Sequence, residues 1–379
     1  MFLQKSGGRV APADRFLGLR AFVDGCRSPS WLGTGGALVV FALIFCVCCL
    51  NITEARFLRS PGRFSLDKED EFPFVKAKAM RIGSAAPSAK TYRVVLIGDS
   101  AIEEAITSPE DLQRRVQRRA GRKVSVTCLL AGGMNQFEAA DLCGVMQDHL
   151  HGEVVLQISP YHMAMIPTSE LYHKTVTSIG VDSTQLADAF ARVNLPRPRY
   201  FGNFFLRNHA FLFARTAAWL RLFRPLPEPR LHVRPKERDS SMQRFQRDAQ
   251  HTYLDTKGMR SKSAANLAVY QCITGPLGAR GVKVALLESP MNPRLASYNG
   301  ENGRGINPSD KKAYRELRAL LAEQSHAVVW DLSRKAKLVS KDFADYIHIE
   351  REPARARFTR ALADQIAASI PARKRKVTA

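Results

Sequence analysis

Outside one apolar run, paired cysteines and zinc-type clusters are missing from this sequence. None of the cysteines beyond that run belongs to a CxxC pair or to a His–Cys cluster with metal-ligand spacing. Three of the seven cysteines lie together in that run, and the main body of the chain holds only Cys128, Cys143 and Cys272. An odd number of cysteines excludes a disulfide framework and allows one bridge at most in that part of the chain.

Acidic residues are also scarce: 35 Asp and Glu stand against 57 Lys and Arg, which gives a net charge of +22. This balance favours anionic partners, namely phospholipid headgroups, acidic glycans or nucleic acid. Internal repeats are absent as well. The composition, 45% hydrophobic and 24% charged over 379 residues, excludes a mainly disordered, collagenous or multi-span membrane protein and indicates one large or two modest globular domains.

A single uncharged apolar run covers residues 31–52. At 1.5 Å per residue it would form roughly 33 Å of helix, so it predicts a transmembrane signal anchor. A cleavable signal peptide and a lipoprotein site at Cys48 or Cys49 are the alternatives. Basic residues are more frequent in residues 1–30 than just after the run, which predicts a cytoplasmic N-terminus in a bacterial inner membrane and an extracytoplasmic remainder. Nucleic acid is then excluded as a partner.

Short apolar runs alternate with amphipathic stretches after a polar linker over residues 53–90. Five nearly continuous apolar runs predict strands buried on both faces, at 94–97, 124–130, 154–158, 282–287 and 327–332. Helical patterns occupy most of the connections, including 136–150, 264–277, 309–324 and 353–370. The economical fold is an α/β domain over residues 91–370, with a five-stranded parallel sheet covered by helices.

The connection between the third and fourth strands is too long for an ordinary crossover. We expect a large helical insertion at about residues 165–262, forming a cap or lid. Its aromatic and basic segment 204–223 fits either a helix resting on an anionic membrane or a helix buried against the domain. The chain ends in a basic tail over residues 371–379.

Two short motifs could carry chemistry. The first strand ends in Gly98-Asp99-Ser100, at the sheet edge where open α/β folds place their sites. Asp345 and His348 follow the last strand. A serine hydroxyl attacks only when a base removes its proton, and a carboxylate holds that base in its useful tautomer. The alternative is that each motif is an ordinary turn.

These motifs resemble those of the SGNH/GDSL hydrolase superfamily of serine esterases and acyltransferases. VVLIGDS is similar to its nucleophile block, LLAGGMNQ to its glycine block and FADYIHIE to its D-x-x-H block, and the likeness runs from Tyr92 to Ile370. The resemblance implies a flavodoxin-like three-layer sandwich without cofactor or metal. It makes Ser100 the nucleophile, His348 the base and Asp345 its orienter, and it places an oxyanion hole at the Ser100 N–H and at Gly132 or Gly133.

One block departs from the family pattern. The third strand runs into Ser159-Pro160-Tyr161-His162, where the family has G-x-N-D, so the usual oxyanion Asn is absent. Asn135 could take its place, or act only as a loop cap; Tyr161 and His162 are further candidates. Asp99 is included among the expected oxyanion and substrate-binding residues.

The anchor, the G-D-S motif and the insertion together resemble a subgroup that modifies cell surfaces. It includes the D-alanyl transfer protein of teichoic-acid systems and O-acetylation proteins of exported polysaccharides. This resemblance implies a membrane-bound O-acyltransferase as partner and an anionic or neutral glycan as substrate. We therefore expect a membrane-anchored esterase or acyltransferase acting on acetyl groups of a polysaccharide. The alternatives are a non-catalytic scaffold of an export complex and a lipid-directed esterase that uses 204–223 as its lid.

Overall fold

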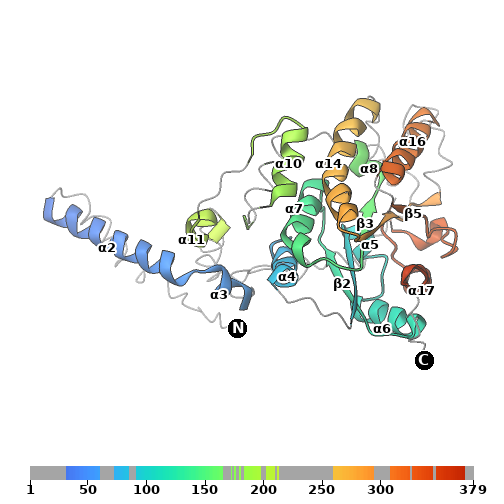
Figure 1. Ribbon diagram of the computed structural model, residues 1–379, viewed down its shortest axis with the longest axis horizontal. Helices are drawn as coiled ribbons and strands as arrows, with labels where there is room; N and C mark the ends of the chain where they lie inside the picture. The colour runs from blue at the N-terminus through green and yellow to red at the C-terminus, as the bar shows by residue number, and fades with distance from the viewer. Residues whose placement is uncertain are drawn as a thin grey trace, which may run out of the picture.

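A five-stranded parallel sheet forms the centre of the protein (Figure 1). The computed structural model describes residues 31–59, 72–84, 91–164, 172, 175, 179–180, 183–197, 202–209, 211–212, 259–293, 308–324, 327–344 and 347–371. The strands, in sequence order, are β1 Tyr92–Gly98, β2 Val124–Leu130, β3 Glu153–Ile158, β4 Lys283–Glu288 and β5 Val328–Trp330. Their spatial order is β2-β1-β3-β4-β5, the flavodoxin-like order.

All five predicted strands are present, and the predicted α/β class is confirmed. Every pairing is parallel, with Leu96 opposite Cys128 and Val155 opposite Ala285. β3 is buried along its whole length, as continuous apolar strands between two helical layers should be. β5 differs from the other strands in length and burial. It contains only three residues of the predicted run 327–332, and Val328 is 55% exposed because β5 lies at the edge of the sheet.

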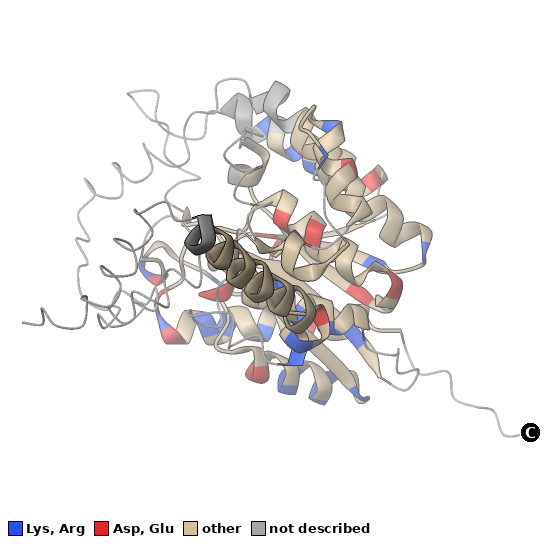
Figure 2. Cartoon of the chain, turned by 90° about the vertical axis from the view of Figure 1, so that its left-hand side faces the viewer, with Lys and Arg blue, Asp and Glu red and all other residues tan. Residues whose placement is uncertain are grey.

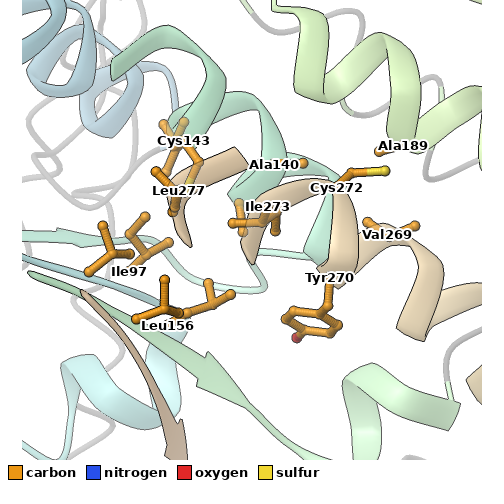
Figure 3. Packing of buried hydrophobic residues seen from close by; sticks show 14 of the residues in the cluster. Ile97, Ala140, Cys143, Leu156, Ala189, Val269, Tyr270, Cys272, Ile273 and Leu277 are labelled. Carbon is orange, nitrogen blue, oxygen red and sulfur yellow. The ribbon is translucent and has the colours of Figure 1, made fainter. Parts of the chain in front are cut away.

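Helices cover both faces of the sheet and make three layers (Figure 1). One hydrophobic cluster joins the sheet to α4 Phe72–Ser84, α7 Gln136–Met146, α10 Thr184–Arg192, α14 Met259–Ala279 and α16 Pro308–Gln324. The other joins it to α5 Ser100–Glu103, α6 Pro109–Ala120 and α17 Glu352–Ser369. Two 3₁₀ turns, Gln147–His149 and Ser340–Asp342, complete the domain. Figure 3 shows side chains of α7 and α14 packed together over the strands.

Local signals explain where these helices begin and end. Ser108 caps α6 by accepting a hydrogen bond from the Asp111 N–H at 3.1 Å, and Pro109 occupies the first helical position, as the sequence predicts. The same helix ends at Gly121, whose φ of 59° is left-handed. α14 starts earlier than the predicted 264–277 and contains Pro276 in its last turn.

The segment expected to be a polar linker, 53–90, instead holds two helices, α3 Glu54–Arg59 and α4. α4 belongs to the domain, because Val75 and Ala79 are part of the main hydrophobic cluster. On the same helix Lys76 forms an ion pair with Asp141 of α7, and the two side chains are 1% and 0% exposed. The sequence pattern did not predict that Lys76 is buried, because its ion-pair partner lies on a different helix.

The long connection between β3 and β4 is described in pieces: α8 Pro160–Ala164, α10 and α11 Phe204–Arg207. α10 packs on α7 and α14, and the cap or lid expected for the insertion as a whole stays a prediction. Most of the aromatic segment 204–223, together with residues 1–30 and the tail from 372 onward, lies outside the described residues.

Helix α2, Trp31–Asn51, projects away from the domain (Figure 1) and carries no charged residue (Figure 2). Its apolar side chains are exposed, including Leu38, Phe41, Leu43 and Leu50. Within the part of the chain that the structure describes, no helix has both the length and the hydropathy needed to cross a membrane. This finding does not support the transmembrane span predicted over 31–52.

Candidate functional site

The turn between β1 and α5 holds Ser100 at the carboxyl edge of the sheet. Asp99 caps α5: its backbone is extended and its Oδ1 accepts a hydrogen bond from the Ala101 N–H at 2.8 Å. Ser100 is therefore the first helical residue and is half-buried. The preceding peptide stays in the strand ladder, where the Gly98 carbonyl accepts from the Ala131 N–H at 3.2 Å.

The structure brings Ser100 and His348 together. Ser100 Oγ and His348 Nε2 lie 3.0 Å apart, although 248 positions separate the two residues. The distance is within the range that proton transfer between a hydroxyl and a base requires. The contact joins two motifs that lie at opposite ends of the domain sequence, as the topology of the sheet predicts.

Hydrogen bonds connect the segment that contains His348 to α17. A single antiparallel bridge joins Phe343 to Ile349, and the Ala344 N–H donates to the His348 carbonyl at 2.9 Å. Asp342 is buried; its carboxylate accepts from Arg357 of α17 at 2.8 Å, and its carbonyl accepts from the Glu350 N–H at 2.9 Å. Asp345, the predicted orienter of the base, lies outside the described residues, so its role stays a prediction.

The glycine block lies beside the turn because β2 pairs with β1. Gly132 and Gly133 are exposed after β2, and Gly133 has a φ of 64°, which only glycine adopts readily. Asn135 caps α7: its Oδ1 accepts from the N–H groups of Phe137 and Glu138 at 2.9 and 3.0 Å. The loop-cap alternative for Asn135 is thus observed.

The cap uses only one end of the Asn135 amide. Asn135 is 2% exposed, and its Nδ2 has no hydrogen-bond partner among the described residues. It borders an internal void of about 10 Å³ whose wall includes Gly98 and Asp99, the two residues before Ser100. A buried donor without an acceptor is costly, which sets Asn135 apart from a fully satisfied helix cap.

The Asp99 carboxylate is engaged inside the protein. Gln157 Nε2 donates to Asp99 Oδ1 at 2.7 Å, and His162 Nε2 lies 3.2 Å from Asp99 Oδ2. Burial by itself raises the pKa of Asp99, but the His162 imidazole and the Gln157 and Ala101 donors outweigh it and lower that pKa below its usual range. A carboxylate held in this way orders the turn before Ser100, and the substrate-binding role expected for Asp99 stays a prediction.

Gln157 is the residue of this site that sequence reasoning missed. It was counted within an apolar strand run, yet a polar side chain in the middle of a buried strand is itself a signal. His162 was considered as an oxyanion donor, but its ring faces Asp99 and is buried. The side chain of Tyr161, the other such candidate, lies outside the described residues.

The glycine of the G-D-S motif has an explanation in Gln157. Gly98 sits in an extended strand, so a tight turn does not require it. A Cβ at this position would instead lie 2.3 Å from Gln157 Oε1 and 3.2 Å from Gln157 Cβ. Glycine is therefore present because the Gln157 amide crosses over it.

Among the described residues, no group of three or more His, Cys, Asp or Glu side chains is placed to hold a metal ion. Cys128, Cys143 and Cys272 are all free thiols, and Figure 3 shows Cys143 and Cys272 on different helices of the apolar cluster. A scan against protein-family models found no match, and neither did a search of the curated proteins.

Proposed function

We propose that this chain is a serine acyl-esterase or acyltransferase of the SGNH type. The observation that carries the proposal is the 3.0 Å contact between Ser100 Oγ and His348 Nε2 at the carboxyl edge of a parallel sheet. Open α/β sheets bind their substrates at this edge. The strand order and the three ordered motifs support the same family.

In the proposed reaction, Ser100 Oγ attacks the acyl carbonyl carbon while His348 Nε2 takes the hydroxyl proton. The negative charge that develops on the carbonyl oxygen accepts hydrogen bonds from the Ser100 N–H, from a glycine N–H at 132 or 133, and from Asn135 Nδ2. His348 then gives its proton to the departing alcohol, leaving an acyl group on Ser100. A hydroxyl of water or of a glycan then attacks this ester while His348 takes its proton, and His348 returns that proton to Ser100 Oγ as the acyl–serine bond breaks, with Asp345 orienting the imidazole.

We further propose an acetylated polysaccharide at the cell surface as the substrate, and a membrane-bound O-acyltransferase as the partner that supplies or receives the acyl group. The net charge of +22 supports an anionic polymer. The exposed apolar side chains of α2 support attachment of an extracytoplasmic domain to the membrane.

The test uses the full chain in detergent micelles, with p-nitrophenyl acetate as substrate and a fluorophosphonate as probe. We expect Ser100→Ala to lose turnover and labelling entirely, and His348→Ala to lose about 10²- to 10⁴-fold in rate. Ser125→Ala and His151→Ala, which lie at the opposite sheet edge, are the matched controls and should keep full activity. An unlabelled wild type that releases no p-nitrophenol would contradict the enzyme and favour a scaffold in an export complex.

A further inference from the structure

A buried amide ties together the carboxyl ends of three strands behind Ser100. Gln157 of β3 accepts a hydrogen bond from the Asp99 N–H at 2.6 Å through its Oε1. Its Nε2 donates to Asp99 Oδ1 at 2.7 Å and to Ser289 Oγ, just after β4, at 2.6 Å. Both amide hydrogens and the amide oxygen are thus used, and all three residues are buried.

His162 and Tyr270 complete this network from two helices. His162 of α8 places Nε2 3.2 Å from Asp99 Oδ2, and both side chains are buried. The Tyr270 hydroxyl of α14 donates to the Gln157 carbonyl at 3.3 Å and lies 3.4 Å from His162 Nδ1. Figure 3 shows the Tyr270 ring of the apolar cluster extending from α14 with its hydroxyl at the far end.

These contacts act on the peptide group before Asp99 and on the peptide group after Ser100. The Asp99 N–H is held by Gln157, and the Ala101 N–H is held by the Asp99 carboxylate. The direction of the Ser100 N–H and the position of Ser100 Oγ therefore depend on where Asp99 is held. Gln157 and His162 both contact Asp99, the residue before Ser100, so their effect on the reaction can pass through Asp99.

We propose that Gln157, His162 and Tyr270 are positioning residues, which hold Asp99 so that Ser100 Oγ faces His348 and the Ser100 N–H faces the oxyanion. The proposal rests on the function proposed above. It assigns these side chains a kinetic role in addition to their contribution to folding. A displacement of about 1 Å at a reacting group can cost about 10²-fold in rate, so loss of the network should lower kcat far more than it changes KM.

The experiment measures kcat and KM with p-nitrophenyl acetate, the rate of Ser100 labelling by the fluorophosphonate, and thermal unfolding, all on the full chain. We expect Gln157→Met to lower kcat by about 10²-fold with little change in KM. Asn208→Leu is the matched control, because Asn208 is also a buried amide with backbone partners, Gly180 and Phe204, remote from the site. It should lose comparable stability and keep its kcat.

Two further variants keep the proposal testable if Gln157→Met fails to fold. Tyr270→Phe removes a single hydroxyl and should lower kcat by about 3- to 10-fold. His162→Gln, which can still donate to Asp99, should be several-fold faster than His162→Phe. Unchanged kcat in folded Tyr270→Phe and His162→Phe would overturn the positioning role while leaving the esterase intact. A wild type that is neither labelled nor active would overturn the esterase first, and the positioning role with it.

Discussion

The two edges of the parallel sheet each bury one carboxylate, and they do so in opposite ways. At the carboxyl edge Asp99 is surrounded by donors and borders a void of only about 10 Å³. At the amino edge Glu153 lines a cleft of about 750 Å³ together with Lys283, Trp330 and Ser369. The donors around Asp99 lower its pKa, whereas burial raises the pKa of Glu153 despite Ser369 and Lys283 nearby.

The difference shows that burial alone does not decide what a carboxylate does to a fold. Desolvation acts in the same direction on both groups, but only Asp99 has enough aligned donors to outweigh it. The edge with the dense network is also the edge that carries Ser100 and His348. Preorganisation is thus concentrated on one side of the sheet.

The largest expected effect on stability concerns a third buried carboxylate. Asp141 is balanced by the positive charge of Lys76. Lys76→Met leaves Asp141 unpaired among apolar residues and should lower the free energy of unfolding by about 3–5 kcal/mol. The double variant Lys76→Met/Asp141→Leu should recover most of that loss. Urea unfolding monitored by circular dichroism checks both. Equal losses in the single and double variants would show that the ion pair itself, rather than the uncompensated charge, matters.

A smaller effect on stability is expected from replacing glycines at the two sheet edges, because their surroundings differ. Gly98→Ala places a Cβ against the Gln157 amide and should lower unfolding free energy by about 1–3 kcal/mol and kcat by about 10²-fold. Gly281, at the amino edge, has a φ of 73° and no atom within 4 Å of an added Cβ. Gly281→Ala should cost about 1 kcal/mol of backbone strain and leave kcat unchanged. Esterase assays beside thermal unfolding separate the two; a kcat that falls equally in both would contradict the assignment of Gly98.

The smallest effects concern pH, and they should differ in sign. The lowered pKa of Asp99 gives stability above the unfolded value of about 3.9, and that stability is lost as pH falls through the folded value. The raised pKa of Glu153 acts in reverse: its favourable contribution exists below about 4.3 and is lost as pH rises through the folded value.

At pH 7 Asp99→Asn should therefore cost about 1–3 kcal/mol, with less difference from wild type near pH 3. Glu153→Gln should be neutral or stabilising by up to about 1 kcal/mol at pH 7, with the gain shrinking at low pH. Unfolding free energies measured between pH 3 and 7 test this directly. If Asp99→Asn kept the pH dependence of the wild type, Asp99 would not be the group that causes the loss of stability at low pH.

The sequence predicted the elements whose signals are local. Continuous apolar runs located the five strands, and the Ser108-Pro109 pair located the start of α6. The two motifs that meet at the site were also found, because each follows a strand and such ends converge at one edge. These inferences needed only periodicity and the topology of a parallel sheet.

What escaped prediction depends on side chains from distant parts of the chain. Lys76 looked like a linker residue, since its counterion lies on α7. Gln157 looked like one polar residue in an apolar strand, since its partners are Asp99 and Ser289. Neither pairing leaves a periodic trace in the sequence, so only the packed structure shows which polar residues are compensated.

The Gln157 amide lies over Gly98, so the residues at positions 98 and 157 cannot be substituted independently of each other. A residue larger than glycine at 98 becomes acceptable only when residue 157 is short enough to withdraw, for example as serine, and then the Asp99 N–H must find another acceptor. A combinatorial library that varies the G-D-S motif alone would therefore yield destabilised chains at position 98, whereas one that varies 98, 99 and 157 jointly can recover alternative solutions.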